Sequence, residues 1–406
     1  MKRTLLVLAL AILGLLAIGL VLLASAGGAV PPPEYNGEPL AFLWKANPHL
    51  CKQAMFLGVA IVPFGVAFFL DYHIWQKKPW LTVALYVVVA VMLVAVLFMS
   101  SAAHKGSHRW IDLGVMQIQP SEIAKIATII VTAVFLDRAR WKVELFWKGA
   151  IPAAAIFGIF AGLILKEPDF GSTVIVGVLG LALMWVAGVK FWHILLLAPI
   201  GAVFVVGYLI FNQNRMRRLL AHLPESIGNK LIDALNLPFD AVADEKIKNA
   251  VYQKQQSIIA IQRGGITGVG FNQSQQKHQF LPERHTDFIF AIGAEEWGLV
   301  FSLALLALFV TIFVCGIMIS LHAPDRLGQL IASGVTFLIF LQAVCNMGVV
   351  SGVLPTKGLA LPFISYGGTN LVMSLTAMGL LFGVGRRISL QNQLRRSKIS
   401  AVLNNN

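Results

Sequence analysis

The chain alternates between long apolar runs and short polar segments. Ten of these runs are long enough to cross a membrane as helices: 5–24, 53–70, 80–101, 120–136, 149–165, 171–187, 191–211, 288–320, 328–350 and 366–385. A hydrocarbon core about 30 Å thick needs roughly 20 residues of helix, because each residue advances a helix by about 1.5 Å. The pattern therefore predicts an all-α polytopic membrane protein with ten transmembrane helices, in a single domain over residues 1–406.

Composition agrees with this class. Hydrophobic residues make up 57% of the chain, charged residues only 13%, and the mean hydropathy is +0.76, which excludes an ordinary soluble domain. The three cysteines show neither a disulfide framework nor metal-ligand spacing. The first run ends at 24–26 in a sequence resembling a signal-peptide cleavage site. It is longer than a usual signal core, so we interpret it as an uncleaved anchor.

Charge in the short loops predicts the orientation of the helices. If the amino terminus is cytoplasmic, the cytoplasmic segments carry fifteen Lys and Arg residues and the short outer loops carry six. The positive-inside rule favours this arrangement. Both termini are then cytoplasmic, 386–406 is a basic cytoplasmic tail, and the long loop 212–287 between helices seven and eight lies outside. We expect any chemistry on that outer face, where nucleotides are not supplied.

A cluster of ionisable residues lies where the long loop meets the eighth apolar run. The stretch 281–297 reads LPERHTDFIFAIGAEEW and places Glu283, Arg284, His285 and Asp287 within five residues. Ionisable groups at a membrane boundary are costly and indicate a functional site. The alternative is a solvated, charge-rich end of a loop.

Two further outer segments carry candidate residues near the fourth run. Arg109 and Trp110 belong to a loop that is either an interfacial anchor or one wall of an outward site. Pro120 suits the first turn of a helix, with Gln119 or Ser121 as its cap. Glu122 and Lys125, three residues apart, can pair on one helix face, or Lys125 can turn to an anionic lipid headgroup.

Other outer segments add a cap, a basic stretch and an irregular backbone. Asp169, in the tight turn 166–172, is a natural helix cap. Arg215 belongs to the basic stretch 214–220, which suits either phosphate-bearing headgroups or general anchoring to the membrane surface. Segment 354–368 contains Lys357 and Ser365; its prolines and glycines predict irregular backbone near membrane depth, tolerated only against protein or a wet cavity.

The remainder of the long loop has a local helix signal. Residues 224–250 are of mixed charge and predict a mobile excursion, whereas 252–262 recovers helical periodicity and stops at Gly264-Gly265. The run 264–270 (GGITGVG) has neither dinucleotide-binding nor P-loop spacing, so no nucleotide cofactor is expected. The spacings Gly158/Gly162 and Gly379/Gly383 predict close helix packing.

Four groups of motifs, in order along the chain, carry a family resemblance. They are HRWIDLG with QPSEIAK, then EPDFGS, then QQSIIAIQRGGITGVGF with LPERHTDFIFAIGAEE, and LPTKGLALPFISYGG. Together they resemble the SEDS family (shape, elongation, division and sporulation) of ten-span peptidoglycan glycosyltransferases over roughly residues 50–390. LPTKG and the segment 169–171 are closer to the division branch than to the elongation branch.

The resemblance implies a reaction and a catalytic residue. The reaction is polymerisation of lipid II into glycan strands at the outer face of the cytoplasmic (inner) membrane. The essential aspartate of the family motif matches Asp287, and a functionally important tryptophan matches Trp110. The chain departs from the family pattern at Thr369-Asn370, where two serines are common, and at Trp297, where leucine is frequent. The loop 224–250 is also longer than is usual in the family, so partner contacts there do not carry over.

The expected mechanism follows from glycosyl transfer. Asp287 would act as general base on the acceptor hydroxyl, and cations or a divalent ion would stabilise the pyrophosphate leaving group. Mg²⁺ or Mn²⁺, with Asp287 or His285 as ligand, is left open because H-x-D alone is weak evidence for a metal. Candidate substrate-binding residues are Arg109, Trp110, Glu122, Lys125, Arg215, Glu283, His285, Lys357 and Ser365.

The expected partners are lipid II, the growing glycan strand, membrane lipids, a class B penicillin-binding protein transpeptidase and other division proteins; no nucleic acid is expected. Two alternatives from other classes stay open. One is a lipid II flippase, suggested by ten spans and the Glu122/Lys125 pair. The other is a non-catalytic scaffold for division proteins, consistent with the basic tail. An elongation enzyme is the alternative within the family.

Overall fold

The structure is a computed structural model of the whole chain. It describes residues 1–27, 47–98, 109–112, 114, 117–140, 142–167, 169–211, 245–278, 280–355 and 358–404, with residues 216, 220, 227, 230 and 232 singly. The long helices are α1 (Lys2–Gly27), α3 (Pro48–Phe69), α5 (Pro79–Phe98), α6 (Pro120–Arg138), α7 (Ile151–Lys166), α8 (Phe170–Val186), α9 (Phe191–Phe211), α12 (Glu245–Gly264), α13 (Ile289–Leu321), α14 (Arg326–Val350) and α15 (Gly368–Asn404).

Shorter elements complete the described part of the chain. A four-residue helix, α4 (Ile74–Lys77), precedes α5, and the π-helical turn η1 (Phe146–Ala150) leads into α7. Two-residue strands β1 (Ile111–Asp112) and β2 (Gln117–Ile118) pair antiparallel, with Ile111 opposite Ile118. These two strands form a small hairpin just before α6.

Each predicted apolar run falls largely within a helix, and the multi-pass membrane character is confirmed. Seven helices of the described part are long and apolar enough to span: α1, α3, α5, η1 with α7, α13, α14 and α15. The helices α8 and α9 have shorter apolar stretches, and α6 contains Glu122, Lys125 and Asp137. The number of ten spans and their orientation therefore stay a prediction.

Three boundaries differ from the sequence prediction. Helix α12 ends at Gly264 as predicted but begins at Glu245, so 245–250 is helical and not an irregular excursion. Helix α15 continues through the predicted tail to Asn404. Helix α13 is broken at Gly298, where φ is 71° and ψ is −159°, so the eighth run forms two helical segments.

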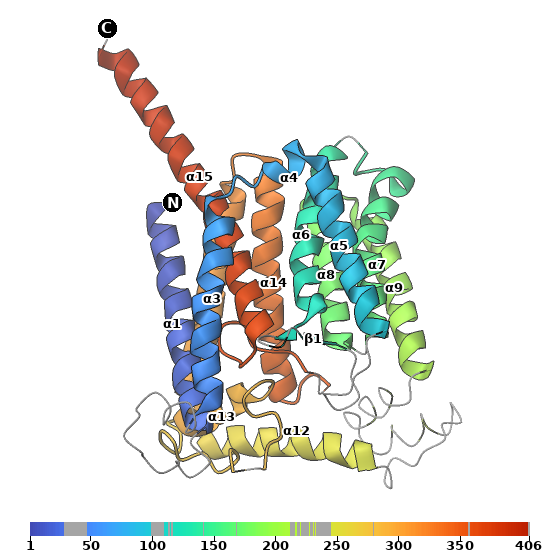
Figure 1. Cartoon of the computed structure of the whole chain (residues 1–406), viewed down its shortest axis with the longest axis vertical. Coiled ribbons are helices and arrows are strands. Elements are labelled where there is room, and N and C mark those ends of the chain that lie inside the picture. The colour runs from blue at the N-terminus through green and yellow to red at the C-terminus, as the bar shows by residue number, and fades with distance from the viewer. Residues whose placement is uncertain are drawn as a thin grey trace.

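The long helices stand side by side, and α12 lies across one end of the bundle (Figure 1). The start of α1 and the end of α15 both lie at the opposite end (Figure 1). Helix α15 packs on α3 through glycines: a Cβ at Gly379 would lie 2.5 Å from the carbonyl oxygen of Phe64. The Gly379/Gly383 prediction is confirmed, whereas a Cβ at Gly158 or Gly162 would meet no described atom within 4 Å.

A polar network ties the helices together at the end opposite α12. Asp71, after α3, accepts a hydrogen bond from Arg387 of α15 at 2.6 Å and pairs with Lys77 at 3.2 Å. Tyr72 donates to Asp325, the N-cap of α14, at 2.6 Å. These bonds join α3, α14 and α15 at the end of the bundle opposite the candidate residues of the Asp287 stretch.

Candidate functional site

The turn that carries Asp287 lies directly before α13 and is held by its backbone. Its three successive carbonyl oxygens each accept one hydrogen bond. The bonds run from Tyr366 N to His285 O (2.9 Å), from Ser365 Oγ to Thr286 O (2.6 Å), and from Asn346 Nδ2 to Asp287 O (2.9 Å). Because these donors come from α14 and the segment before α15, the turn has a fixed place against both.

The carboxylate of Asp287 lies against Gly358. A Cβ on Gly358 would come within 2.9 Å of Oδ2 of Asp287, so only glycine leaves the carboxylate in place. The next residue is fixed as well, because Asn346 Nδ2 also donates to the carbonyl oxygen of Leu359 at 2.6 Å. Asn346, 1% exposed in α14, thus joins the Asp287 turn to the 358–366 segment.

Asn346 was missed from sequence. Its only signal was a polar side chain inside the apolar run 328–350, which is by itself an indication of function. Ser365, a candidate from the sequence, holds the backbone in place. Its hydroxyl also accepts a hydrogen bond from the backbone N–H of Leu361 at 2.8 Å.

His285 is a neutral imidazole at physiological pH. Burial lowers its pKa to about 4, the neighbouring His49 and Arg284 lower it further, and Glu283 opposes the decrease. Its ring stacks on His49 with centroids 4.3 Å apart, and Arg284 Nε donates to its Nε2 at 3.3 Å. Since Nε2 accepts this bond, the ring proton belongs on Nδ1.

The residues around Asp287 form no protein-only metal cage. Within the described ranges, no three His, Cys, Asp or Glu side chains are placed to hold one ion. Arg284 donates to Nε2 of His285, so this nitrogen is not available as a metal ligand. Glu283 is exposed and shapes the turn: its φ is 56°, and its carbonyl oxygen accepts from the N–H of Thr286 at 3.1 Å. The divalent ion stays a prediction.

The hairpin before α6 is attached to the start of α15. Thr369 Oγ1 donates to the carbonyl oxygen of Gln117 at 2.8 Å and accepts from the N–H of Gln119 at 3.2 Å. Asn370 Nδ2 donates to Glu122 at 3.3 Å. The two residues that depart from the family pattern therefore still bridge α15 to β2 and α6.

The predicted Glu122–Lys125 pair forms inside the protein. Lys125 Nζ lies 2.7 Å from Glu122 Oε1, and Lys125 is only 1% exposed. Gln119 caps α6 by position, with Pro120 in the first turn as predicted. The structure thus shows the pairing interpretation; a contact of Lys125 with an anionic headgroup stays a prediction.

Asp169 caps α8, as predicted from sequence. Its side chain accepts from the N–H of Ser172 at 3.1 Å, and Ser121 Oγ and Gln119 Nε2 each donate to it at 3.1 Å. Burial acts to raise its pKa, but the charges of Arg109 and Lys125 and the Ser172 hydrogen bonds bring the pKa below its usual value. Asp169 is therefore an ionised, fully hydrogen-bonded cap.

Glu167, two residues earlier, is the opposite case. Both of its carboxyl oxygens are buried without a hydrogen-bond partner in the described part of the chain. Burial raises the pKa of Glu167 to about 9, the charge of Asp169 adds to the increase, and Arg109 opposes it. Arg109 also donates from Nε to the carbonyl oxygen of Glu167 at 3.3 Å. Glu167 thus carries its proton at neutral pH.

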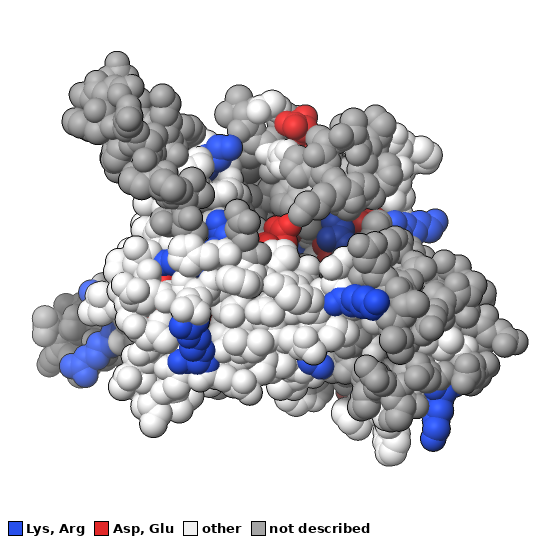
Figure 2. Space-filling view, turned by 90° about the horizontal axis from the view of Figure 1, so that it is seen from below, with Lys and Arg blue, Asp and Glu red and all other residues white. Residues whose placement is uncertain are grey.

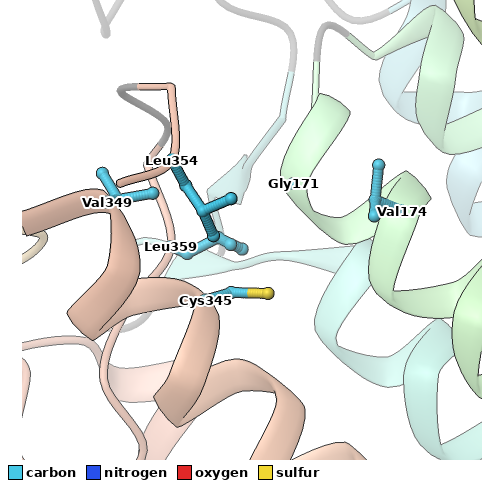
Figure 3. Close-up of a pocket in the computed structure, with 6 residues that line it drawn as sticks. All are labelled: Gly171, Val174, Cys345, Val349, Leu354 and Leu359. Carbon is cyan, nitrogen blue, oxygen red and sulfur yellow. The ribbon is translucent and has the colours of Figure 1, made fainter. Parts of the chain in front are cut away.

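A small apolar pocket lies between α8 and the end of α14 (Figure 3). Its lining residues are Gly171, Val174, Cys345, Val349, Leu354 and Leu359. The side chain of Leu359 packs so closely on α8 that a Cβ at Gly171 would lie 2.7 Å from it. Leu359 lines the pocket, and the residue before it, Gly358, lies against the carboxylate of Asp287. Two adjacent residues thus contact the pocket and the carboxylate.

Two candidates, Arg215 and Lys357, lie outside the described residues, as does most of the loop excursion at 224–244. Trp110 is half-buried directly before β1. Seen from the α12 end, the described surface is mostly uncharged, and its charged side chains are mainly Lys and Arg (Figure 2). The structure brings Glu283, His285, Asp287 and Ser365 together at one turn, with Arg109, Trp110, Glu122 and Lys125 near the start of α6.

A family model decides the classification. Residues 5–389 match the model of the FtsW, RodA and SpoVE family, described as cell cycle proteins. The chain belongs to this family. The SEDS resemblance seen in the motifs is therefore confirmed.

Relatives in this family match nearly end to end. A Coxiella burnetii protein named "probable peptidoglycan glycosyltransferase FtsW" is 35% identical over 382 residues, covering 92% of this chain and 93% of that one. Stage V sporulation protein E of Bacillus subtilis is 34% identical over 376 residues, covering 92% and 94%.

Solved structures of the family share the fold. The rod shape determining protein RodA of Thermus thermophilus aligns with a TM-score of 0.62 at 25% identity, covering 93% of this chain and 95% of that one. A chain of a peptidoglycan synthase complex, studied for its coordination of polymerisation and crosslinking, aligns with a TM-score of 0.67 at 25% identity, covering 94% and 97%.

Proposed function

We propose that the chain is a peptidoglycan glycosyltransferase that polymerises lipid II into glycan strands during cell division, with Asp287 as general base. The enzyme class is the one that its relatives carry in their names, at about a third identity over most of both chains. The observation that carries the site is the placement of Asp287. Three backbone hydrogen bonds fix its turn, and Gly358 leaves room for its carboxylate.

The proposed topology has ten spans, both termini in the cytoplasm and the 212–287 loop outside the cytoplasmic membrane. The start of α1 and the end of α15 lie at the bundle end away from α12, as an even number of spans requires (Figure 1). Residues 1–406 then form one domain whose basic tail, 386–406, points inward. Asp287 and α12 are placed on the outer side, where lipid-linked sugars arrive.

In the proposed reaction, the acceptor hydroxyl oxygen attacks the anomeric carbon of the donor sugar. The bond from that carbon to the pyrophosphate oxygen breaks, and its electron pair leaves with the pyrophosphate. The hydroxyl proton passes to the carboxylate of Asp287, a contribution on the order of 10²–10⁴ in rate. Neutral His285 cannot attract the substrate as a cation, so its proposed role is to shape the turn.

The leaving pyrophosphate needs positive charge. Arg109 and Lys125, with Arg215 and Lys357 from outside the described ranges, are the proposed source, and Trp110 is a proposed wall of the binding site. A divalent ion such as Mg²⁺ or Mn²⁺ would supply the same charge if bound.

The proposed partner is a class B penicillin-binding protein transpeptidase. A chain in a complex that coordinates polymerisation and crosslinking shares this fold, which supports a partner that crosslinks peptides. Other division proteins are proposed on the same family grounds. Relatives named FtsW match at 35% identity and the RodA structure at 25%, which favours division over elongation.

The deciding experiment is polymerisation of lipid II by the purified protein in detergent, with the transpeptidase added if required. Detergent removes the two sides of a membrane, so a flippase would make no product and a pure scaffold would make none either. We expect glycan chains from the wild type and a loss of at least about 10²-fold for Asp287→Asn. Asp112→Asn, an exposed carboxylate in the outer hairpin, is the matched control and should retain activity.

A further inference from the structure

A second polar network surrounds the first turns of α13, behind the Asp287 turn. It contains Glu295, Glu296 and Lys277, which are 0%, 0% and 1% exposed, and Ser25 of α1, which is 2% exposed. None of these groups is part of the proposed reaction. Buried charges are expensive to keep, so each requires a reason for its presence.

Lys277 is the centre of this network. Its Nζ lies 3.3 Å from Glu296 Oε1 and 3.2 Å from Ser25 Oγ, and it also donates to Asn272 Oδ1. Ser25 Oγ in turn donates to Glu296 Oε1 at 2.5 Å. Three segments that are distant in sequence, α1, the 272–277 segment and α13, thus meet at one ammonium group.

Glu295 fastens the same segment to α13 by its backbone. The carboxylate accepts from the N–H of Gln275 at 3.0 Å, from the N–H of Gln276 at 3.3 Å and from the hydroxyl of Ser274. A charged partner, Arg263 at the end of α12, lies 3.7 Å away. The segment therefore has little freedom to move along α13.

The network connects directly to the Asp287 turn. Arg284 Nη1 donates to the backbone carbonyl of Lys277, and Arg284 Nε donates to His285 Nε2 at 3.3 Å. Asp287 follows two residues later. Arg284 thus links the backbone of Lys277 to the turn that carries Asp287.

From this geometry we infer that Lys277 and Glu296 are a positioning pair for the glycosyl transfer: they hold residues 272–278, and through Arg284 the turn, so that Asp287 reaches the acceptor hydroxyl. The inference rests on the proposed function of Asp287. The pair touches no substrate and acts through Arg284. A displacement of about 1 Å at a reacting group can reduce a rate about 10²-fold, so such a pair affects catalysis without taking part in it.

The test separates position from stability. An apolar replacement of both members of a buried ion pair is often neutral or stabilising, because it removes the desolvation cost. We therefore expect Lys277→Met/Glu296→Met to keep a melting temperature close to the wild type. Its kcat for lipid II polymerisation should fall on the order of tenfold or more, while KM for lipid II stays within about twofold.

The matched control is Asp71→Asn, which removes a charge from the polar network at the opposite end of the bundle. It should lower the melting temperature and leave kcat unchanged. A double variant that folds and turns over at the wild-type rate would overturn the positioning role. An equal loss of kcat in Asp71→Asn and in the double variant would also overturn the positioning role. The loss of a polar network anywhere in the bundle would then lower the rate.

If the double variant does not fold, a second variant tests the same inference. Asn272 has a φ of 61°, which glycine also adopts, so Asn272→Gly removes only the bond to Lys277. We expect a severalfold fall in kcat with little change in KM, and unchanged kcat would contradict the inference. Asp287→Asn is assayed in parallel: if it polymerises normally, the proposed function fails, whereas if only the network variants are fully active, the positioning role alone fails.

Discussion

Buried lysine–glutamate pairs lie at the start of α6 and beside the first turns of α13, and the two pairs differ in what they join. Glu122 and Lys125 lie three residues apart on α6, so their pairing follows from the helix itself. Lys277 and Glu296 lie on different segments, and each also forms a hydrogen bond with Ser25 of α1. A pair within one helix can stabilise that helix, but only a pair between segments can fix one segment relative to another.

The largest expected effect is the removal of one lysine from either pair. Lys277→Met leaves Glu296 with Ser25 as its remaining described partner, and should lower the free energy of unfolding by about 3–5 kcal/mol. Lys125→Met should cost less, because the side chain of Glu122 is 10% exposed whereas that of Glu296 is fully buried. Thermal unfolding in detergent measures both. Equal losses would show that the two pairs do not differ in this respect.

The next effect concerns Glu167, a buried carboxyl whose oxygens have no hydrogen-bond partner among the described residues. Its raised pKa, about 9, means that the folded state keeps a proton that the unfolded state releases above about pH 4.5. Its contribution to stability is therefore full below that pH and is lost as the pH rises towards 9.

Glu167→Gln removes this titration. We expect the variant to be more stable than the wild type at pH 8.5 by about 1–3 kcal/mol, on the scale of burying an unsatisfied polar group, and to match the wild type near pH 4.5. Melting curves at the two pH values decide it. A difference that grows as the pH falls would contradict the raised pKa.

A smaller effect is expected at the α13 end from Gly358→Ala. The added Cβ would lie 2.9 Å from Asp287 Oδ2, so the carboxylate must move. We expect kcat to fall on the order of tenfold, equivalent to about 1.4 kcal/mol in the activation free energy, with the melting temperature nearly unchanged. Gly65→Ala, where a Cβ would meet open space, is the control. Full activity in Gly358→Ala would place the reacting atoms away from this contact.

The smallest effect on stability is expected when both charges of the α6 pair are removed. Glu122→Met/Lys125→Met should unfold within about 1 kcal/mol of the wild type, because no unpaired charge remains. The same variant tests the predicted substrate-binding role of the pair. If the pair binds substrate, KM for lipid II should rise. An unchanged KM and kcat would leave the α6 pair with a structural role only and sharpen its contrast with Lys277 and Glu296.

Local features were predictable from the sequence, and long-range ones were not. The apolar runs, the cap at Asp169 and the Glu122–Lys125 pair each depend on residues within a few positions of one another. The site stretch around Asp287 was found because ionisable groups stood beside an apolar run. The hydrogen bond from Asn346 to the carbonyl oxygen of Asp287 joins residues 59 positions apart, and no local spacing indicates it.

Other parts of the α13 end escaped prediction for the same reason. Glu295 and Glu296 stood in the stretch singled out from sequence, yet their partner Lys277 lies nineteen positions before Glu296. The break in α13 was missed because Gly298 within an apolar run looks like any glycine that lets helices pack. Its distinguishing property, a φ of 71°, depends on the backbone of 266–268 lying against it.

This break also bears on how mutational scans of the family should be interpreted. A Cβ at Gly298 would lie 2.5 Å from the backbone nitrogen of Gly268, and Cβ atoms at Gly264 and Gly268 would collide with the backbone at Ala294 and Glu296. We expect alanine at these three glycines to abolish activity as fully as a change at Asp287, with a loss of folded protein that Asp287→Asn does not show. Sensitivity in a growth-based screen thus identifies catalytic residues only when protein levels are measured alongside it.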